Sequence, residues 1–157
     1  VGRHTGLAYY TLGQRQGLGI GGTRGAGDAP WFVAGKDRAR NALIVVQGHD
    51  HALLYRDAVD AQEVHWIAGV APSMPARLGA KTRYRMADAA CTVHTSVDAT
   101  VGTNDRVLHA TFDAPQWAPT PGQYLVLYDG DTCLGGAVIV DRDGSVSGSR
   151  AEAAVAM

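Results

Sequence analysis

The sequence has little cysteine, no surplus of charge and no long apolar run, and each shortage excludes a class of protein. The two cysteines, Cys91 and Cys133, are too few for a disulfide-rich secreted scaffold and favour a reduced, cytoplasmic chain. No apolar stretch reaches the length of a membrane-spanning helix. Charged residues make up 18% and the formal net charge is -1, so any nucleic-acid contact would need a local basic patch.

Glycine is abundant, with 20 residues, and this favours tight turns over long helices. Strand-like segments recur along the chain with turn residues between them, and the Asp129-Gly130 pair is a strong hairpin signal. We therefore predict an all-β protein with one short helical turn within residues 7–15. The predicted strands are 31–34, 42–46, 61–68, 80–86, 90–95, 106–112, 124–128 and 132–140.

A domain boundary is expected between residues 52 and 62, which divides the chain into 1–58 and 59–141. The remaining residues, 142–157, are rich in Ser, Gly and Ala and are predicted to be disordered or frayed. The first residue is Val1, directly before an ordered-looking motif. We therefore expect the sequence to be a piece of a longer protein.

A basic segment follows the predicted boundary, where Lys81, Arg83 and Arg85 alternate with Thr82 and Tyr84. On a strand the three cations would share one face at roughly 7 Å spacing, similar to the spacing of phosphates along a nucleic-acid strand. An RNA-backbone contact is one interpretation. A solvated edge strand protected by positive charge is the other, with Tyr84 packed in the core on the opposite face.

The second candidate segment is Thr120-Pro121-Gly122-Gln123, in which Pro-Gly predicts a type II turn. The turn would place Gln123 at the start of a strand, where its amide could bond a base edge or a sugar. A surface turn with a solvated amide is the alternative.

Other tempting segments do not predict chemistry. The glycine-rich run 13–22 lacks the Gly-Lys-Ser/Thr of a nucleotide loop, and its better interpretation is a tight structural loop. His49-Asp50-His51 has no further ligands at metal-site spacing. Cys91 and Cys133 lie in predicted strands without a neighbouring base, so both are interpreted as structural. No catalytic residue, metal site or cofactor is predicted for this chain.

Several motifs, in order, resemble those of bacterial tRNA-specific 2-thiouridylases, and the resemblance covers about residues 2–140. The matching segments are 2–7, 10–15, 17–22, 30–33, 36–37, 41, 47–49, 81–85, 120–123, 128–130 and 133–136. That family has an N-terminal ATP-pyrophosphatase domain with two catalytic cysteines, a small central domain and a C-terminal barrel similar to domain 2 of elongation factor Tu. The resemblance implies a small central β domain followed by a six-stranded-type β-barrel. ATP with magnesium is expected only for the parent enzyme.

The resemblance also implies tRNA-binding roles for Arg83, Tyr84 and Gln123, with Lys81 and Arg85 as further candidates. Residues Arg3, His4 and Arg15 could extend the RNA surface. The expected function is to position tRNA while the parent enzyme thiolates C2 of the wobble uridine with ATP and a cysteine persulfide. Expected partners are tRNA, the N-terminal domain and a sulfur-relay protein. The alternative is a scaffold barrel that docks that domain or the relay protein.

Overall fold

The computed structural model describes residues 2–20, 29–97, 106–141 and, for the backbone alone, 154–156. The chain divides into two compact units, residues 1–55 with 143–157 and residues 56–142. Regular structure in the described ranges is mostly β-strand, with two 3-10 turns, η1 (Leu7–Tyr9) and η2 (Ala52–Leu54). The all-β prediction is confirmed. None of the helical segments in these ranges is long and apolar enough to span a membrane.

The first unit contains a three-stranded antiparallel sheet in the order β1-β2-β9, formed by β1 (Trp31–Asp37), β2 (Ala42–Gln47) and β9 (Ala154–Ala156). The β1–β2 hairpin turn occupies residues 38–41. The Asp37 carboxylate closes this turn by accepting a 2.9 Å hydrogen bond from the Arg40 backbone N–H.

A long irregular segment, residues 2–20, packs on this sheet. It is tied to β1 by hydrogen bonds from Gly13 N to Val33 O (2.8 Å) and from Val33 N to Gln14 O (3.0 Å). The Gln14 side chain supports the loop from within, because its Oε1 accepts from Thr11 N and its Nε2 donates to Gln16 O. The glycine-rich run is thus a structural loop. The buried cluster of the unit comprises Tyr10, Leu18, Val33, Leu43 and Val45.

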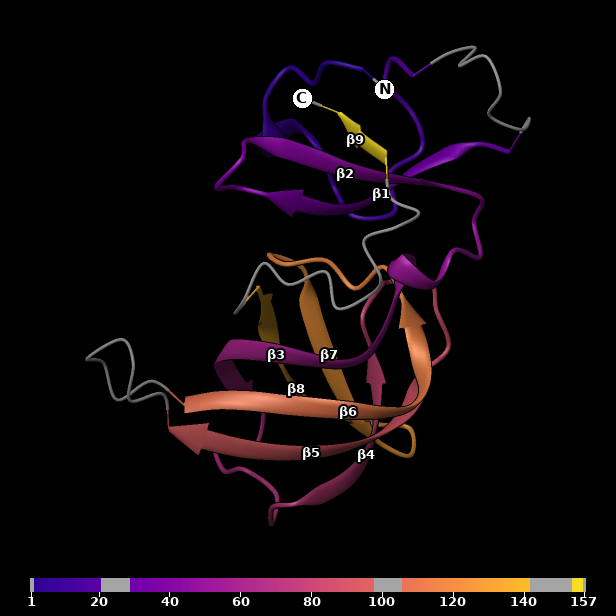
Figure 1. Ribbon diagram of the computed structural model, residues 1–157. Coiled ribbons are helices and arrows are strands. Elements are labelled where there is room, and N and C mark those ends of the chain that lie inside the picture. The colour runs from indigo at the N-terminus through magenta and orange to yellow at the C-terminus, as the bar shows by residue number, and fades with distance from the viewer. Residues whose placement is uncertain (1, 21–28, 98–105, 142–153, 157) are drawn as a thin grey trace. The chain divides into compact units, whose positions relative to one another are not determined.

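The second unit is a closed six-stranded barrel in the order β3-β6-β5-β4-β7-β8 (Figure 1). Its strands are β3 (Tyr55–Trp66), β4 (Ala76–Lys81), β5 (Ala89–Val97), β6 (Arg106–Trp117), β7 (Tyr124–Asp129) and β8 (Thr132–Val140). The predicted six-stranded-type barrel is confirmed. Closure leaves no unpaired sheet edge, so every strand is held from both sides.

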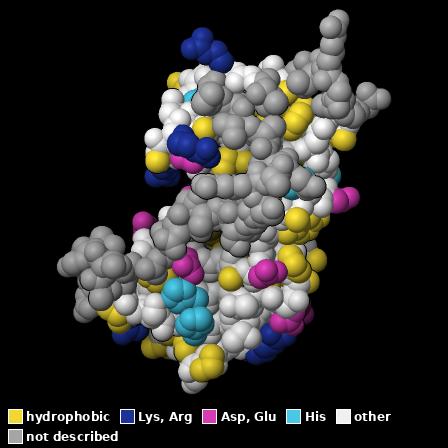
Figure 2. Space-filling model, in the orientation of Figure 1, with side chains coloured by type: hydrophobic (Ala, Val, Ile, Leu, Met, Phe, Trp, Pro, Cys, Tyr) yellow, Lys and Arg dark blue, Asp and Glu magenta, His cyan; other side chains and the backbone are white. Residues whose placement is uncertain are grey.

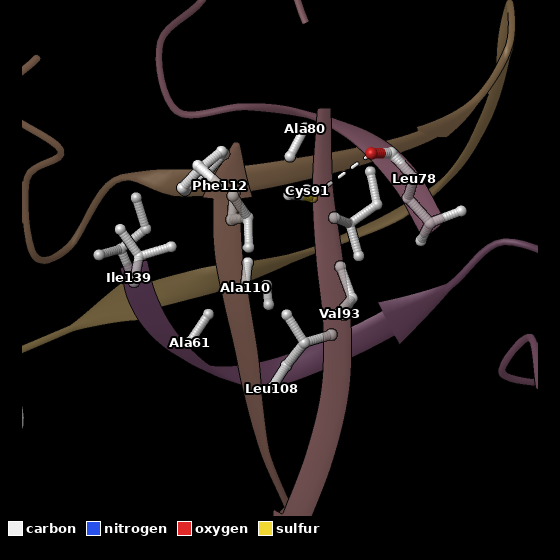
Figure 3. Close-up of a cluster of buried hydrophobic side chains, with 13 residues drawn as sticks. Ala61, Leu78, Ala80, Cys91, Val93, Leu108, Ala110, Phe112 and Ile139 are labelled. Carbon is white, nitrogen blue, oxygen red and sulfur yellow. Dashed lines mark hydrogen bonds between the residues drawn. The ribbon is translucent and has the colours of Figure 1, made fainter. Parts of the chain in front are cut away.

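Alternation along the strands fills the barrel interior. In β7, Leu125 and Leu127 are buried while Tyr124 and Val126 face outward. Small side chains such as Ala61, Ala80 and Ala110 lie among larger ones such as Leu108 and Phe112, as an interior of limited width requires (Figure 3). Side chains from the six strands therefore form the packed core of the barrel.

Several strand boundaries differ from the sequence prediction. Strand β3 begins at Tyr55 instead of residue 61, and β1 ends at Asp37 instead of residue 34. Two further differences, at β4 and β6, affect the candidate site. Strand β4 ends at Lys81, and residues 82–88 form a loop, so the predicted strand over 80–86 is wrong in its second half. Strand β6 continues through Pro115 to Trp117, beyond the predicted end at residue 112. The two segments are in contact, because the Arg83 side chain of the 82–88 loop reaches Trp117 at the end of β6 and the Ala118 carbonyl.

The ends of the predicted domains also differ from the observed units. The division falls between Tyr55 and Arg56, within the expected window of residues 52–62, although the finer bound after residue 58 lies inside β3. The tail 142–157 was predicted to be frayed or disordered. Residues 142–153 and 157 of this tail lie outside the described residues. Its remaining segment, Ala154–Ala156, pairs with β2.

Candidate functional site

Two loops meet at one end of the barrel, residues 82–88 between β4 and β5 and residues 118–123 between β6 and β7. They meet because β4 pairs antiparallel with both β5 and β7, so the end of β4 lies beside the start of β7, with Lys81 opposite Val126. The Lys-Thr-Arg-Tyr-Arg and Thr-Pro-Gly-Gln motifs are far apart in sequence, and the barrel brings them together.

Arg83 connects the two loops. Its guanidinium carbon lies 4.8 Å from the centre of the Trp117 ring, and its Nη2 donates a 2.9 Å hydrogen bond to the Ala118 carbonyl. Burial lowers the pKa of Arg83, but an arginine keeps its charge in proteins. A guanidinium stacked on an indole face is held in one plane, so Arg83 is a fixed cation at the surface.

The Ala118 carbonyl accepts hydrogen bonds from both loops. Ala118 is buried with a left-handed φ of 44°, a conformation that costs a non-glycine residue about 1 kcal/mol. Its carbonyl also accepts a 3.0 Å hydrogen bond from Thr120 Oγ1, and Thr120 O in turn accepts one from Gln123 N at 3.0 Å. Hydrogen bonds therefore link Arg83 continuously to the turn that carries Gln123.

The Pro121-Gly122 turn has the predicted geometry. Gly122 has a φ of 84°, and the Gln123 N to Thr120 O bond closes the four residues, as in a type II turn. Gly122 N donates to Ile139 O and Ile139 N donates to Gln123 O, both at 2.8 Å, which fixes the turn to β8. The backbone of Gln123 is thereby held while its side chain is exposed.

The remaining candidates of the basic motif differ from the strand arrangement that was expected. Tyr84 is 93% exposed, so the interpretation that it packs in the core is wrong. Arg85 is exposed on the loop, and Lys81 lies on the outer face of β4 with its Nζ 4.9 Å from the centre of the Tyr128 ring. The three cations do not line one strand face, because the chain leaves the sheet after Lys81, with Thr82 buried.

The structure adds a residue that sequence reasoning missed, Trp117. It lies beyond the predicted strand 106–112, in a segment that contains three prolines, a residue type that disfavours strands. An aromatic residue three positions before the Thr-Pro-Gly-Gln motif was the available signal, but its partner, Arg83, lies in a separate motif.

Arg3, His4 and Arg15 belong to the first unit. Arg3 and Arg15 are exposed. His4 is a structural residue: its Nδ1 accepts from Gly6 N at 3.1 Å, which leaves the proton on Nε2, and that nitrogen donates to Asn41 O at 2.8 Å. His4 therefore links the N-terminal segment to the β1–β2 turn.

The two cysteines and the histidines of the 49–51 segment were the remaining reactive side chains considered from the sequence. Cys91 is buried, its thiol donates to Leu78 O at 3.5 Å, and burial raises the pKa of Cys91 to about 11, which keeps the thiol protonated and unreactive at neutral pH. Cys133 is exposed on β8.

His51 caps η2 by accepting from Leu53 N, and His49 contacts Asp50. Within the described ranges no three His, Cys, Asp or Glu side chains gather as metal ligands would.

Comparison with known families divides the chain in the same two parts. Residues 1–47 match the family described as tRNA methyl transferase PRC-barrel domain, and residues 56–139 match the family described as aminomethyltransferase beta-barrel domain.

Curated relatives carry the name tRNA-specific 2-thiouridylase MnmA. The protein of Thiobacillus denitrificans is 63% identical over 139 residues, 88% of this chain and 37% of the relative. That of Chromohalobacter salexigens is 58% identical over 139 residues, 88% of this chain and 34% of the relative. That of Burkholderia pseudomallei is 51% identical over 159 residues, 99% of this chain and 40% of the relative. The chain thus spans about two fifths or less of the length of these relatives.

Proposed function

The chain belongs to the tRNA-specific 2-thiouridylase family, of which it spans the central and C-terminal domains, and on this premise we propose that its barrel positions tRNA for the thiolation of wobble uridine. The observation that carries the proposal is the hydrogen-bonded connection from Arg83 through Ala118 and Thr120 to Gln123. It makes one surface out of the two motifs for which the family resemblance implies tRNA contact.

The chemistry of this surface suits an RNA strand. Arg85 and Lys81 supply positive charge, and Arg83 presents a planar guanidinium held against Trp117. Tyr84 offers an exposed ring on which a base can stack, and the exposed amide of Gln123 can bond a base edge or a ribose hydroxyl. Because the cations are local and the whole chain has a net charge of -1, binding would be modest and confined to this barrel end.

The rest of the reaction belongs to the proposal as well. The parent enzyme would use ATP with magnesium to activate the uridine in the cytoplasm, and a cysteine persulfide, loaded by a sulfur-relay protein, would deliver sulfur. The residues described here do not fit an ATP loop, because the N–H of Gly13 is already donated to Val33 O and no lysine follows the glycines. We therefore assign the ATP site and the catalytic cysteines to the N-terminal ATP-pyrophosphatase domain of the family.

The chain by itself should not thiolate tRNA. The buried, protonated thiol of Cys91 cannot act as a persulfide carrier, and the exposed Cys133 lies in the barrel, outside the N-terminal domain to which we assign the catalytic cysteines. Incubation of the 157 residues with tRNA, ATP, magnesium and a persulfide donor should give no 2-thiouridine by mass spectrometry of the digested tRNA. Formation of 2-thiouridine would contradict this assignment.

Binding of tRNA can be tested with a charge-matched control. Arg83→Ala should weaken the binding of labelled tRNA about tenfold and reduce the slope of log K against log salt by about one. Arg106→Ala removes the same charge at the start of β6, at the opposite end of that strand from Trp117, and should change the affinity less than about twofold. Gln123→Ala should weaken binding without changing the salt slope, because it removes no charge.

Equal losses in Arg83→Ala and Arg106→Ala would show a nonspecific charge effect and would contradict the assignment of the site. No measurable binding by the wild type, together with capture of the N-terminal domain or the relay protein, would instead favour the scaffold alternative.

A further inference from the structure

A second side-chain cluster lies on the outer face of the barrel, where β3, β6 and β5 run side by side (Figure 1). Asp60 Oδ1 lies 2.6 Å from His109 Nδ1, and His109 Nε2 lies 2.6 Å from Ser96 Oγ. Figure 2 shows histidine side chains gathered on this part of the surface. The cluster is separate from the two loops described above, since its three members come from the strands themselves.

The hydrogen bonds define the tautomer of the neutral His109 ring. An ionised Asp60 can only accept, so His109 Nδ1 carries the proton. In the neutral imidazole the opposite nitrogen, Nε2, then accepts, and Ser96 donates its hydroxyl proton to it. This is the arrangement in which an imidazole serves as general base for a hydroxyl nucleophile.

The strands hold these groups in place. His94 lies directly opposite His109 across the β5–β6 pair, and the two rings stack with centroids 4.7 Å apart and planes at 19°. Ser96 follows His94 by two residues, so both face outward. The side chains of His109 and Asp60 are 22% and 31% exposed, whereas Ser96 is exposed, so the hydroxyl is the accessible end of the row.

A second set of hydrogen-bonded side chains on the same sheet, Arg77, Thr92 and Asp113, serves as a structural comparison. Arg77 Nη1 donates to Thr92 Oγ1 at 3.3 Å and to Asp113 Oδ1 at 2.7 Å, across β4, β5 and β6. There the hydroxyl accepts from a permanent cation and has no base. The row of Asp60, His109 and Ser96 differs because its hydroxyl meets a proton acceptor.

We propose that Ser96 is a nucleophile activated by His109 and oriented through Asp60, and that it accepts acyl groups from small, uncharged activated esters. Ser96 Oγ forms a bond to the carbonyl carbon as its proton moves to His109 Nε2. The bond from that carbon to the ester oxygen breaks, and the leaving alcoholate takes the proton back from the imidazolium. The products are acyl-Ser96, the free alcohol and a neutral His109. The adjacent carboxylate disfavours anionic acyl donors.

The test uses the whole chain and p-nitrophenyl acetate, with an internal reference. Nitrophenolate release is followed by absorbance, and the acetylated residue is located by peptide mass spectrometry. Ser73 is also exposed but lies in the loop between β3 and β4, with no base described beside it. General-base assistance predicts acetylation of Ser96 about 100-fold faster than that of Ser73.

Variants separate the roles. Ser96→Ala should abolish the fast phase, and His109→Gln, which keeps polar contacts but cannot take the proton, should reduce it to the rate of Ser73. Asp60→Asn should slow it about tenfold because the tautomer is no longer imposed. Equal labelling of Ser96 and Ser73 in the wild type would overturn the proposal, and this comparison needs no variant to fold. Fast release that persists in Ser96→Ala would also overturn it, since the histidines would then be the reactive groups.

Discussion

The two units of this chain reach stable β structure by different means. The barrel closes on itself, and its order and twist follow from strand pairing and an apolar interior. The first unit has a small sheet and a smaller buried cluster, and its long segment 2–20 is held by specific polar contacts such as those of Gln14 and His4. Strand pairing tolerates change on the outside, whereas a segment without regular structure depends on each side chain that satisfies its backbone.

The barrel repeats this contrast within itself. Its strands are held by pairing, but the loops 82–88 and 118–123 depend on single contacts, chiefly Arg83 with Trp117 and Ala118. The candidate RNA surface therefore lies on the part of the barrel unit whose conformation depends on the fewest contacts. Four sets of variants test this difference, and we take them in order of decreasing expected effect.

Gly135→Ala should have the largest effect, because it attacks strand pairing. Gly135 has a φ of +152°, and a Cβ there would lie 2.1 Å from the backbone oxygen of His65 on β3. Backbone atoms in a closed barrel cannot move aside, so we expect a loss of about 3 kcal/mol or more in the free energy of unfolding, measured by urea denaturation. Gly130→Ala, with φ +54° and open space, should cost about 1 kcal/mol. Equal costs would show that the β3–β8 pairing is less tight than described.

Leu127→Ala and Leu43→Ala compare the two cores directly. Both side chains are buried, one in the barrel and one in the first unit, and each truncation should cost about 3 kcal/mol. If the units are stabilised separately, hydrogen exchange should accelerate only in the unit that carries the substitution. Acceleration throughout the chain in both variants would mean that the two cores unfold as one cooperative system.

Trp117→Leu tests the dependence of the loops on single contacts. Loss of the indole removes the stacking partner of Arg83, and we expect about fivefold weaker tRNA binding, which corresponds to ~1 kcal/mol for one cation–π contact. In the double variant with Arg83→Ala the losses should be less than additive, because both changes remove the same contact. Trp66→Leu makes the same change at the last residue of β3, which is paired with Gly135 of β8 and lies outside the loops 82–88 and 118–123. It should leave tRNA affinity unchanged. Additive losses would contradict the role of Trp117 in holding Arg83.

The sequence predicted the parts of this molecule whose causes are local. Alternating apolar residues and Asp129-Gly130 predicted the β7–β8 hairpin, and Pro121-Gly122 predicted the turn between β6 and β7. The same logic failed at residues 82–86, because Lys-Thr-Arg-Tyr-Arg alternates as a strand would. The chain leaves the sheet there because Arg83 binds Trp117 and Ala118, which are more than 30 residues away, and no local pattern carries that information.

Asp113→Asn should have the smallest effect, because it removes a polar contact from the outside of paired strands. The hydrogen bonds and charge of Arg77 lower the pKa of Asp113, so the carboxylate stabilises the folded state above the pKa of the unfolded chain and loses that contribution as pH falls through the lowered folded pKa. Wild type and Asp113→Asn should therefore differ slightly in midpoint temperature near pH 7. The difference should begin to shrink as pH falls below the ordinary aspartate pKa of about 3.9 and should vanish once pH is below the lowered pKa of the folded state. Both side chains are about half exposed, so solvent screens the pair, and the difference should also shrink at high salt. A large loss at neutral pH would show that the outer face of the barrel depends on individual polar contacts as much as segment 2–20 does.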